Sequence, residues 1–260
     1  MVTILRRLPY LNPGSVGLPS IIPTQDELDI MAKPELLYWL RGDSGLTDTQ
    51  WKCRKTGLAF TVASGTVPTP QDMPEYDGRT VARFNVAGAI AAVGAQPTSG
   101  PFSWVLIGRG GTSNAYVIGS GDDPSTSSES RTLIQHTVGG ILNAVIGGVT
   151  AGNTSSYSRP PTAGPNVLIA SHDDVAQQNG LRANYGQLDT LGTAGSATRN
   201  TFDSTLVVGA AGQPEGTLTG RINGGDIADV MVWSVALHLR TDLRDLVERY
   251  SQARYPSVGT

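Results

Sequence analysis

The chain has 260 residues, enough for one large β-rich domain or two small ones, and 39% of them are hydrophobic, so it can bury a core. It contains 32 glycines and 16 prolines, while only 16% of its residues are charged. This composition is rich in turns, but it stays below that of a disordered chain and lacks the Gly-X-Y period of collagen. The formal net charge of −3 provides no basic field for nucleic acid or anionic lipid.

Cys53 is the single cysteine, so an intrachain disulfide is excluded, and with it a disulfide-stapled secreted module. The N-terminus places Arg6 and Arg7 after a short apolar start and lacks the apolar core of a secretory signal. No stretch approaches the ~20 apolar residues of a membrane span. We therefore expect synthesis in a cytoplasm and no membrane insertion.

Residues 1–34 are predicted to form an extended docking arm followed by a short helix. The prolines between residues 9 and 23 exclude a helix or a central strand there. The arm is also too apolar for a solvated linker, so it either packs on its own domain or docks on another subunit. Its docking side chains would be Leu5, Leu8, Tyr10, Leu11, Leu18, Ile21 and Ile22.

Two helices are predicted, one at each end of the chain. Thr24 offers an N-cap for the first, and Glu27 completes a capping box in which its carboxylate returns to the N-cap backbone. Pro34 ends this helix. The second helix is expected over about residues 241–254, before Pro256. Its apolar stripe would be Leu243, Leu246, Val247 and Tyr250.

Between the helices, short apolar runs alternate with turn-forming residues. This pattern predicts a β-sandwich or jelly roll, and the lack of intervening helices argues against a doubly wound α/β fold. Two long polar stretches, 147–164 and 187–199, have the length of loops that bind something or are covered by a partner. The predicted strands are 35–41, 80–86, 102–107, 115–118, 132–134, 141–146, 167–170, 205–208 and 227–233.

The C-terminal half carries a likeness to a known family. The run Gly225-Asp-Ile-Ala-Asp-Val-Met-Val-Trp233, followed by Ala236-Leu237 and a helix ending at Tyr255-Pro256, resembles the closing strands of concanavalin A-like (laminin G-like) jelly-roll domains. The runs 36–40 and 79–84 look like the first strands of that family. The resemblance covers roughly residues 35–256 and implies an all-β, concanavalin A-like β-sandwich over residues 35–260. The family includes lectins, glycoside hydrolases, adhesion modules and virion proteins, so the fold does not select an activity.

Residues that could hydrolyse a glycan are sparse. Laminarinase-type relatives use an E-x-D-x-x-E strand, whereas Glu27-Leu-Asp29 lacks the third carboxylate and lies in a predicted helix. Asp226 and Asp229 are three residues apart on one strand, so we expect their side chains on opposite faces, where they cannot form a pair. The chain has no Gly-x-Ser-x-Gly elbow. These observations predict that the protein is not an enzyme.

The candidates for sugar and calcium binding are loop residues, and for each of them a structural or solvated role is the favoured alternative. Clustered carboxylates would suit Ca²⁺, although the D-x-D-x-D spacing is missing and turn formation is the alternative. No other cofactor is expected. The candidate calcium ligands are Asp122, Asp123, Asp173 and Asp174. The candidate carbohydrate-binding residues are Tyr157, His172, Asp173, Asn179, Asn184 and Tyr185.

The sequence as a whole favours a non-enzymatic bacteriophage virion structural protein, either a capsid decoration protein or a head or tail fibre. The chain starts at its own Met, lacks an export signal and disulfides, and carries an apolar arm, so it is similar to the sandwich domains of tailed-phage structural proteins. Its expected partners are further copies of itself, such as a trimer, other virion proteins and a host-surface glycan. The alternatives are a receptor-binding lectin and a glycan hydrolase.

Overall fold

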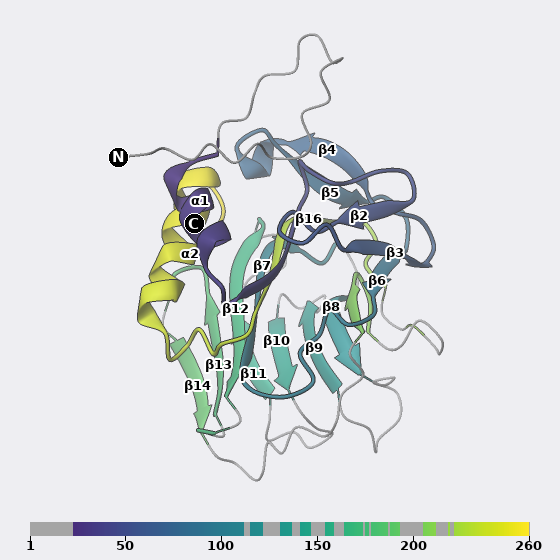
Figure 1. Cartoon of the computed structure of the whole chain (residues 1–260). Helices are drawn as coiled ribbons and strands as arrows, with labels where there is room; N and C mark the ends of the chain where they lie inside the picture. The colour runs from purple at the N-terminus through teal and green to yellow at the C-terminus, as the bar shows by residue number, and fades with distance from the viewer. Residues whose placement is uncertain are drawn as a thin grey trace.

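Two antiparallel β-sheets packed face to face form the body of the protein, and two α-helices cover one of them (Figure 1). Figure 1 shows a computed structural model of the whole chain. Neither described helix is long and apolar enough to span a membrane. The structure describes residues 23–111, 115–121, 131–136, 141–146, 154–158, 164–173, 175–176, 178–186, 188–192, 205–211, 218 and 221–259.

The first sheet, sheet A, has β16 near its centre. This strand pairs with β7 on one side and with β5 and then β1 on the other. In spatial order the strands of sheet A are β14 (Leu188–Gly192), β13 (Gln178–Ala183), β12 (Asn166–Asp173), β7 (Phe102–Arg109), β16 (Gly225–Trp233), β5 (Arg79–Phe84) and β4 (Thr69–Met73), with β1 (Leu36–Arg41) beside β16.

The second sheet, sheet B, faces sheet A across the core. All of its described pairings are antiparallel. Its strands in spatial order are β11 (Thr154–Ser158), β10 (Ile141–Ile146), β9 (Arg131–His136), β8 (Ala115–Gly121), β15 (Leu206–Val208), β6 (Ala89–Ala92), β3 (Ala59–Ser64) and β2 (Gln50–Lys52).

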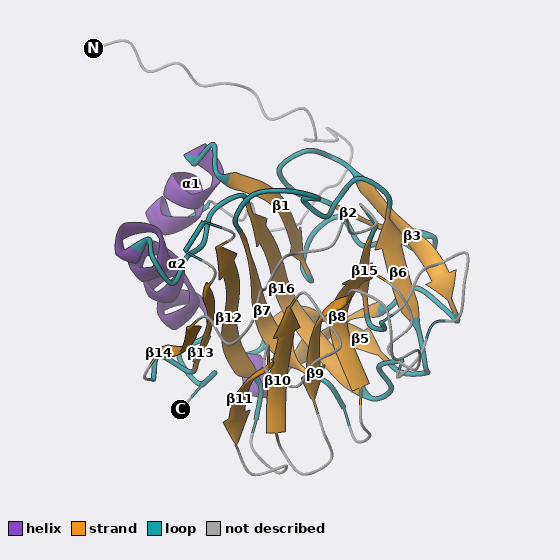
Figure 2. Cartoon of the chain, turned by 90° about the horizontal axis from the view of Figure 1, so that it is seen from below, coloured by secondary structure: helices purple, strands orange, loops and turns teal. Residues whose placement is uncertain are grey.

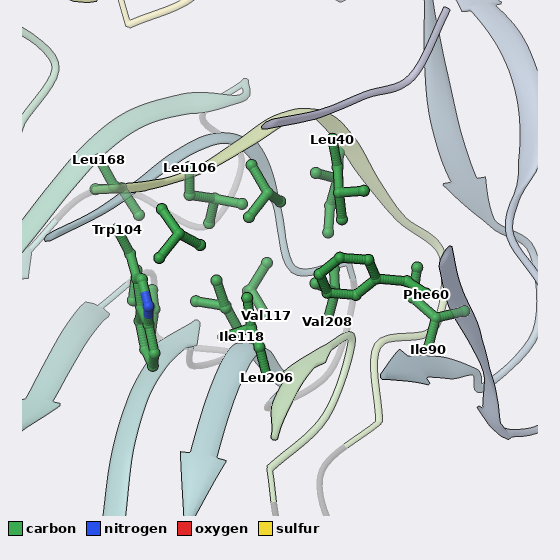
Figure 3. Close-up of a cluster of buried hydrophobic side chains, with 14 of the residues drawn as sticks. Leu40, Phe60, Ile90, Trp104, Leu106, Val117, Ile118, Leu168, Leu206 and Val208 are labelled. Carbon is green, nitrogen blue, oxygen red and sulfur yellow. The ribbon is translucent and has the colours of Figure 1, made fainter. Parts of the chain in front are cut away.

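The core between the sheets is built from the inward-facing positions of both. Trp104 and Leu106 of β7 face Ile118 of β8 and Val208 of β15, and all four side chains are at most 1% exposed (Figure 3). The indole Nε1 of Trp104 donates to Gln96 Oε1 at 2.9 Å, so its polar atom is satisfied. Each such apolar side chain contributes about 1.5–3 kcal/mol on burial. The predicted all-β sandwich with terminal helices is confirmed.

The helices pack on the outer face of sheet A and create a second core there (Figure 2). The helices are α1 (Gln25–Ala32) and α2 (Thr241–Arg254), and a short 3₁₀ helix, η1 (Pro74–Tyr76), precedes β5. The predicted stripe of α2 is buried, and it packs against residues of β1 and β16 such as Trp39 and Met231. Trp39 meets Tyr250 edge to face, with the ring centroids 5.2 Å apart.

The predicted start of α1 is confirmed, but the capping box is wrong. Thr24 Oγ1 accepts a hydrogen bond from the N–H of Glu27 at 3.2 Å, as an N-cap residue does. The carboxylate of Glu27 does not return to the N-cap backbone. It is 1% exposed and points between α1, β1 and α2, where three arginines surround it.

A β-bulge in β16 overturns the prediction that Asp226 and Asp229 lie on opposite faces. The register of β16 against β7 shifts between Ile227 and Asp229, which inserts one extra residue between the two aspartates. Both side chains therefore lie on the outer face of sheet A. Asp226 meets arginines of β5 and β7, and Asp229 meets Tyr250 of the α2 layer.

Candidate functional site

Two arginines and one aspartate form a charged cluster near the end of sheet A where β4 and β5 lie. In the sheet register Asp226 of β16 lies directly opposite Arg83 of β5 and Arg109 of β7. Arg83 Nη1 donates to one carboxylate oxygen of Asp226, and Arg109 Nε donates to the other. Glu75 of η1 accepts from Arg109 Nη2 at 3.3 Å. We call these four residues the arginine cluster.

Burial within the arginine cluster is uneven. The Asp226 side chain is fully buried, whereas the side chains of Arg83 and Arg109 are 22% and 25% exposed and that of Glu75 is 40% exposed. Partial burial by itself lowers the pKa of Arg109, but the charge and hydrogen bond of Asp226 outweigh it and raise that pKa above its ordinary value. The Arg109 guanidinium therefore stays a cation, and the side chains of both arginines are partly open to solvent.

The backbone beneath the arginine cluster is closely packed. Tyr76 is fully buried and donates its hydroxyl to the carbonyl oxygen of Asp226 at 3.2 Å. Burial, followed by the charge of Asp226, raises the pKa of Tyr76 well above its ordinary value, so it stays a donor. A Cβ added to Gly108 of β7 would stand 2.5 Å from the same carbonyl oxygen, so this position requires glycine. The aspartate that orients both arginines is thus held in place.

A second charged cluster lies beneath the two helices. Glu27 Oε1 accepts from Arg41 Nη1 at 2.8 Å and from Arg254 Nη1 at 2.9 Å, and Glu27 Oε2 accepts from Arg54 Nη2 at 3.2 Å. Asp43 binds Arg41 at 2.5 Å and also binds Arg254. Four of these five side chains are less than 10% exposed. This cluster joins α1, β1 and α2.

Asp229 lies at the sheet side of that helical layer, with three neutral donors around it. Trp39 Nε1 donates to Oδ1 at 2.6 Å, and the hydroxyls of Tyr250 and Tyr255 donate to Oδ2 at 3.0 and 2.7 Å. Burial raises the pKa of Asp229 to about 6, although Arg254 and other neighbours act to lower it. The carboxylate is fully buried, so no glycan reaches it in this arrangement.

The outer face of sheet B offers a different kind of surface. A shallow groove of about 270 Å³ lies over β3 and β6, and Thr61 supplies its one side-chain hydroxyl. Val62 and Val93 at its edges are 43% and 67% exposed. No charged or aromatic side chain lines this groove, so it lacks the groups that bind sugars or anions. Its lining residues are Ala59, Thr61, Val62, Ala63, Ala91, Ala92 and Val93.

The predicted sugar-binding residues are not gathered into one site. His172 and Asn179 lie opposite each other on β12 and β13, are at most 4% exposed, and are joined by His172 Nδ1 and Asn179 Oδ1 at 2.7 Å. Because both side chains are buried, a dissolved sugar cannot contact them. Asn184 accepts from the N–H of Val167 at 2.9 Å, and the Tyr185 hydroxyl donates to Ser251 at 3.0 Å, so both brace the turn after β13.

The other predicted site residues give no ligand site within the described part of the chain. Asp173 Oδ1 accepts from the N–H of Ala176 at 2.6 Å. This hydrogen bond is typical of a turn-forming aspartate, the alternative to a calcium ligand. Tyr157 belongs to β11, but its side chain lies outside the described residues, as do the calcium candidates Asp122, Asp123 and Asp174 and the docking arm of residues 1–22. The described residues contain no group of three or more histidine, cysteine or acidic side chains placed to hold a metal.

The sequence did not reveal the arginine cluster, because its members come from four separate elements. One signal was present: Arg83 lies two residues after the apolar Val81, on the same face of β5, so a charged side chain stands where an apolar one is expected. Asp226 opens a strand that is otherwise almost wholly apolar. A charged residue in each of two neighbouring strands is a reason to test whether the two face each other.

No protein-family model matches the chain, and no curated protein matches it. Among solved structures it is similar to the sialidase of Trypanosoma rangeli. In complex with 2,3-difluoro-KDN that enzyme is 13% identical with a TM-score of 0.52, over 88% of this chain and 33% of the sialidase. The same enzyme in complex with sialic acid is 11% identical with a TM-score of 0.51, over 79% of this chain and 32% of the sialidase. The chain therefore spans about a third of the length of these sialidases, and the likeness shows a shared fold.

These similarities overturn two predictions made from the sequence. A non-enzymatic structural protein of a bacteriophage virion was predicted, whereas the T. rangeli structures that the chain resembles are of a sialidase, which is a glycan hydrolase. The same finding contradicts the prediction that the chain is not an enzyme. The β-rich fold is confirmed, but neither a concanavalin A-like nor a phage family is shown. Self-association, a glycan partner and virion location stay predictions.

Proposed function

We propose that this β-sandwich binds an acidic sugar, of the sialic acid class, through the arginine cluster. The observation that carries the proposal is the pair of partly exposed arginine side chains, Arg83 and Arg109, whose guanidiniums both bind the buried carboxylate of Asp226. Arginine presents planar donors that match a carboxylate, and such charge-assisted hydrogen bonds are among the strongest in proteins. Because Asp226 fixes both side chains in advance, a ligand loses little affinity in ordering them.

The similar structures support the choice of ligand class. One of the T. rangeli sialidase structures holds sialic acid, a sugar that carries a carboxylate. Because this chain spans about a third of that sialidase, the proposal concerns binding of the sugar and not the sialidase reaction. We further propose that the sandwich is of the concanavalin A-like kind, on the evidence of the run Gly225–Trp233 and the helix that follows it.

Glu75 occupies the position from which a ligand carboxylate would approach Arg109. Its contact with Arg109 Nη2 is long, at 3.3 Å, and its side chain is 40% exposed. A partly exposed ion pair of this kind contributes about 0.2–1 kcal/mol. An incoming carboxylate can therefore displace Glu75 at small cost, and its removal should strengthen binding.

The proposal is tested by calorimetric titration of the full chain with 3′-sialyllactose and with lactose, which lacks the carboxylate. We expect binding of sialyllactose only. Arg109→Met and Arg83→Met should each weaken it by at least about tenfold, the loss expected for one charge-assisted hydrogen bond. Glu75→Gln should strengthen it by about two- to fivefold. Arg249→Met is the matched control, because Arg249 is 59% exposed on α2 and pairs with Asp26.

Two results would overturn the proposal. One is equal affinity for lactose and sialyllactose, because the carboxylate would then contribute nothing. The other is unchanged affinity in Arg83→Met and Arg109→Met when circular dichroism shows both variants folded. Rising salt should weaken the binding of sialyllactose, because the partly exposed guanidiniums are screened.

A further inference from the structure

The segment that links β16 to α2, residues 234–240, crosses the outer face of sheet A; we call it the crossing segment. Ser103 of β7 and Ser171 of β12 lie directly opposite each other, so both side chains point towards the same face. The Ser103 hydroxyl donates to the carbonyl of Val235 at 2.7 Å and accepts from the N–H of Leu237 at 2.8 Å. The first half of the crossing segment is therefore tied to β7.

The second half of the crossing segment contains His238, which lies against Gly180 of β13. A Cβ added to Gly180 would stand 2.6 Å from both Cβ and Cγ of His238, so the imidazole rests directly on the strand. His238 is 5% exposed, and neither ring nitrogen has a hydrogen-bond partner among the described residues. Ser171, opposite Gly180, also has a buried hydroxyl without a described partner. A buried polar group without a partner destabilises the closed arrangement.

The charges around His238 oppose its protonation. Burial is the main cause that lowers its pKa, and His172 of β12 and Arg244 of α2 lower it further. Arg244 lies close, since its Nη1 donates to the carbonyl of His238 at 3.3 Å. Asp173 of β12 alone raises the pKa, and it does not outweigh the rest. A proton on this ring would thus place a buried charge beside a second cation.

The remaining charged groups of the neighbouring elements are already paired. Arg182 of β13 binds Glu248 of α2 at 2.5 Å. Arg240 of the crossing segment binds Asp242 at the start of α2 at 3.0 Å, and both are exposed. Neither pair supplies a free carboxylate to a protonated His238.

We propose that the end of the crossing segment is an acid-operated latch: protonation of His238 lifts residues 238–240 off β13 and uncovers Ser171 and Gly180. At neutral pH the uncharged ring is tolerated in its buried place. In acid the ring is charged in the open position, where water solvates it, so the population of the open state increases.

The other end of α2 stays anchored when the latch opens. Tyr250 and Tyr255 both bind Asp229, and Arg254 binds Glu27 at 2.9 Å. Burial raises the pKa of Asp229 to about 6, so acid protonates it and relieves the cost of its buried charge. Acid therefore stabilises the C-terminal end of the helix while it loosens the N-terminal end, which confines the opening to the latch.

The test is hydrogen–deuterium exchange of the full chain at pH 7.5 and pH 5.0, corrected for the intrinsic pH dependence of exchange. Linkage to an ordinary histidine pKa of about 6.5 in the open state predicts that opening of residues 238–245 increases in acid by up to about 30-fold. Residues 246–254 should not change. His238→Asn should abolish the increase, whereas His172→Asn, the matched control on β12, should retain it.

Exchange in residues 238–245 that is equal at both pH values would overturn the latch, as would an acid response retained in His238→Asn. If His238→Asn does not fold, an NMR titration of the wild-type chain tests the latch instead. In an NMR titration the His238 ring should take up its proton with a midpoint below 6.5, together with shifts of the Gly180 amide. A midpoint at or above 6.5, or no shift at Gly180, would refute the latch.

Discussion

Glu27 of the N-terminal helix could act as a capping-box residue or as the acceptor of a buried ion-pair network, and one substitution distinguishes these two roles. As a capping-box residue it would be replaceable by glutamine, which serves equally well at that position. In the structure Glu27 is the acceptor for three guanidiniums, at 2.8, 2.9 and 3.2 Å, and is 1% exposed. Glu27→Gln removes a buried charge and turns amide hydrogens towards these donors. Breaking a buried ion pair from one side costs about 3–5 kcal/mol, so we expect a loss of that size in the free energy of unfolding.

Equilibrium unfolding in urea measures this loss, from the midpoint and slope of the transition. Asp29→Asn is the matched control, because Asp29 belongs to the same helix and its carboxylate binds only the side chain of Gln25 among the described residues, at 2.7 Å. We expect the control to change the free energy by less than about 0.5 kcal/mol. A loss below about 1 kcal/mol in Glu27→Gln would refute the buried network as the main role of Glu27.

Three further predictions follow from other parts of the chain. The pKa of Asp229 is raised from 3.8 to about 6 in the folded state, so the stability that its protonated form contributes is lost as pH rises through 6. Relative to Asp229→Asn, the free energy of unfolding should therefore fall by about 2.4 kcal/mol between pH 4 and pH 7, and a constant difference would contradict this. Gly108→Ala should lower it by about 1–3 kcal/mol in urea, because the new methyl group meets the Asp226 carbonyl, and an unchanged midpoint would contradict the close approach. If residues 1–23 mediate self-association, light scattering should show an oligomer that falls to a monomer when the chain begins at Thr24, whereas equal masses would exclude it.

Periodicity was sufficient to predict the architecture. The stripe from Leu243 to Tyr250 is buried as predicted, because a helix on a sheet has one apolar face. The strand 227–233 was predicted from its apolar run and lies at the centre of sheet A, buried on both faces. These elements could be predicted because their burial depends on local spacing.

The charged sites could not be predicted in the same way, because they depend on how strands pair. Arg83, Arg109 and Asp226 are separated by up to 143 residues, and only the register of three strands brings them together. Strict alternation predicted that Asp226 and Asp229 face opposite sides, and a single extra residue in the bulge reverses that result. No local pattern marks this bulge.

The bulge in β16 also explains why the outer face of sheet A can hold two separate charged sites. With strict alternation, Asp229 would project into the apolar core between the sheets, where no donor could satisfy it. The extra residue turns its carboxylate towards Trp39, Tyr250 and Tyr255. These three uncharged side chains donate hydrogen bonds to the carboxylate oxygens. Asp226, before the bulge, keeps its place between two arginines at the edge of the helical layer. One aspartate thus anchors α2 and the other orients the proposed ligand-binding arginines, so filling the ligand site should leave the α2 anchor unchanged.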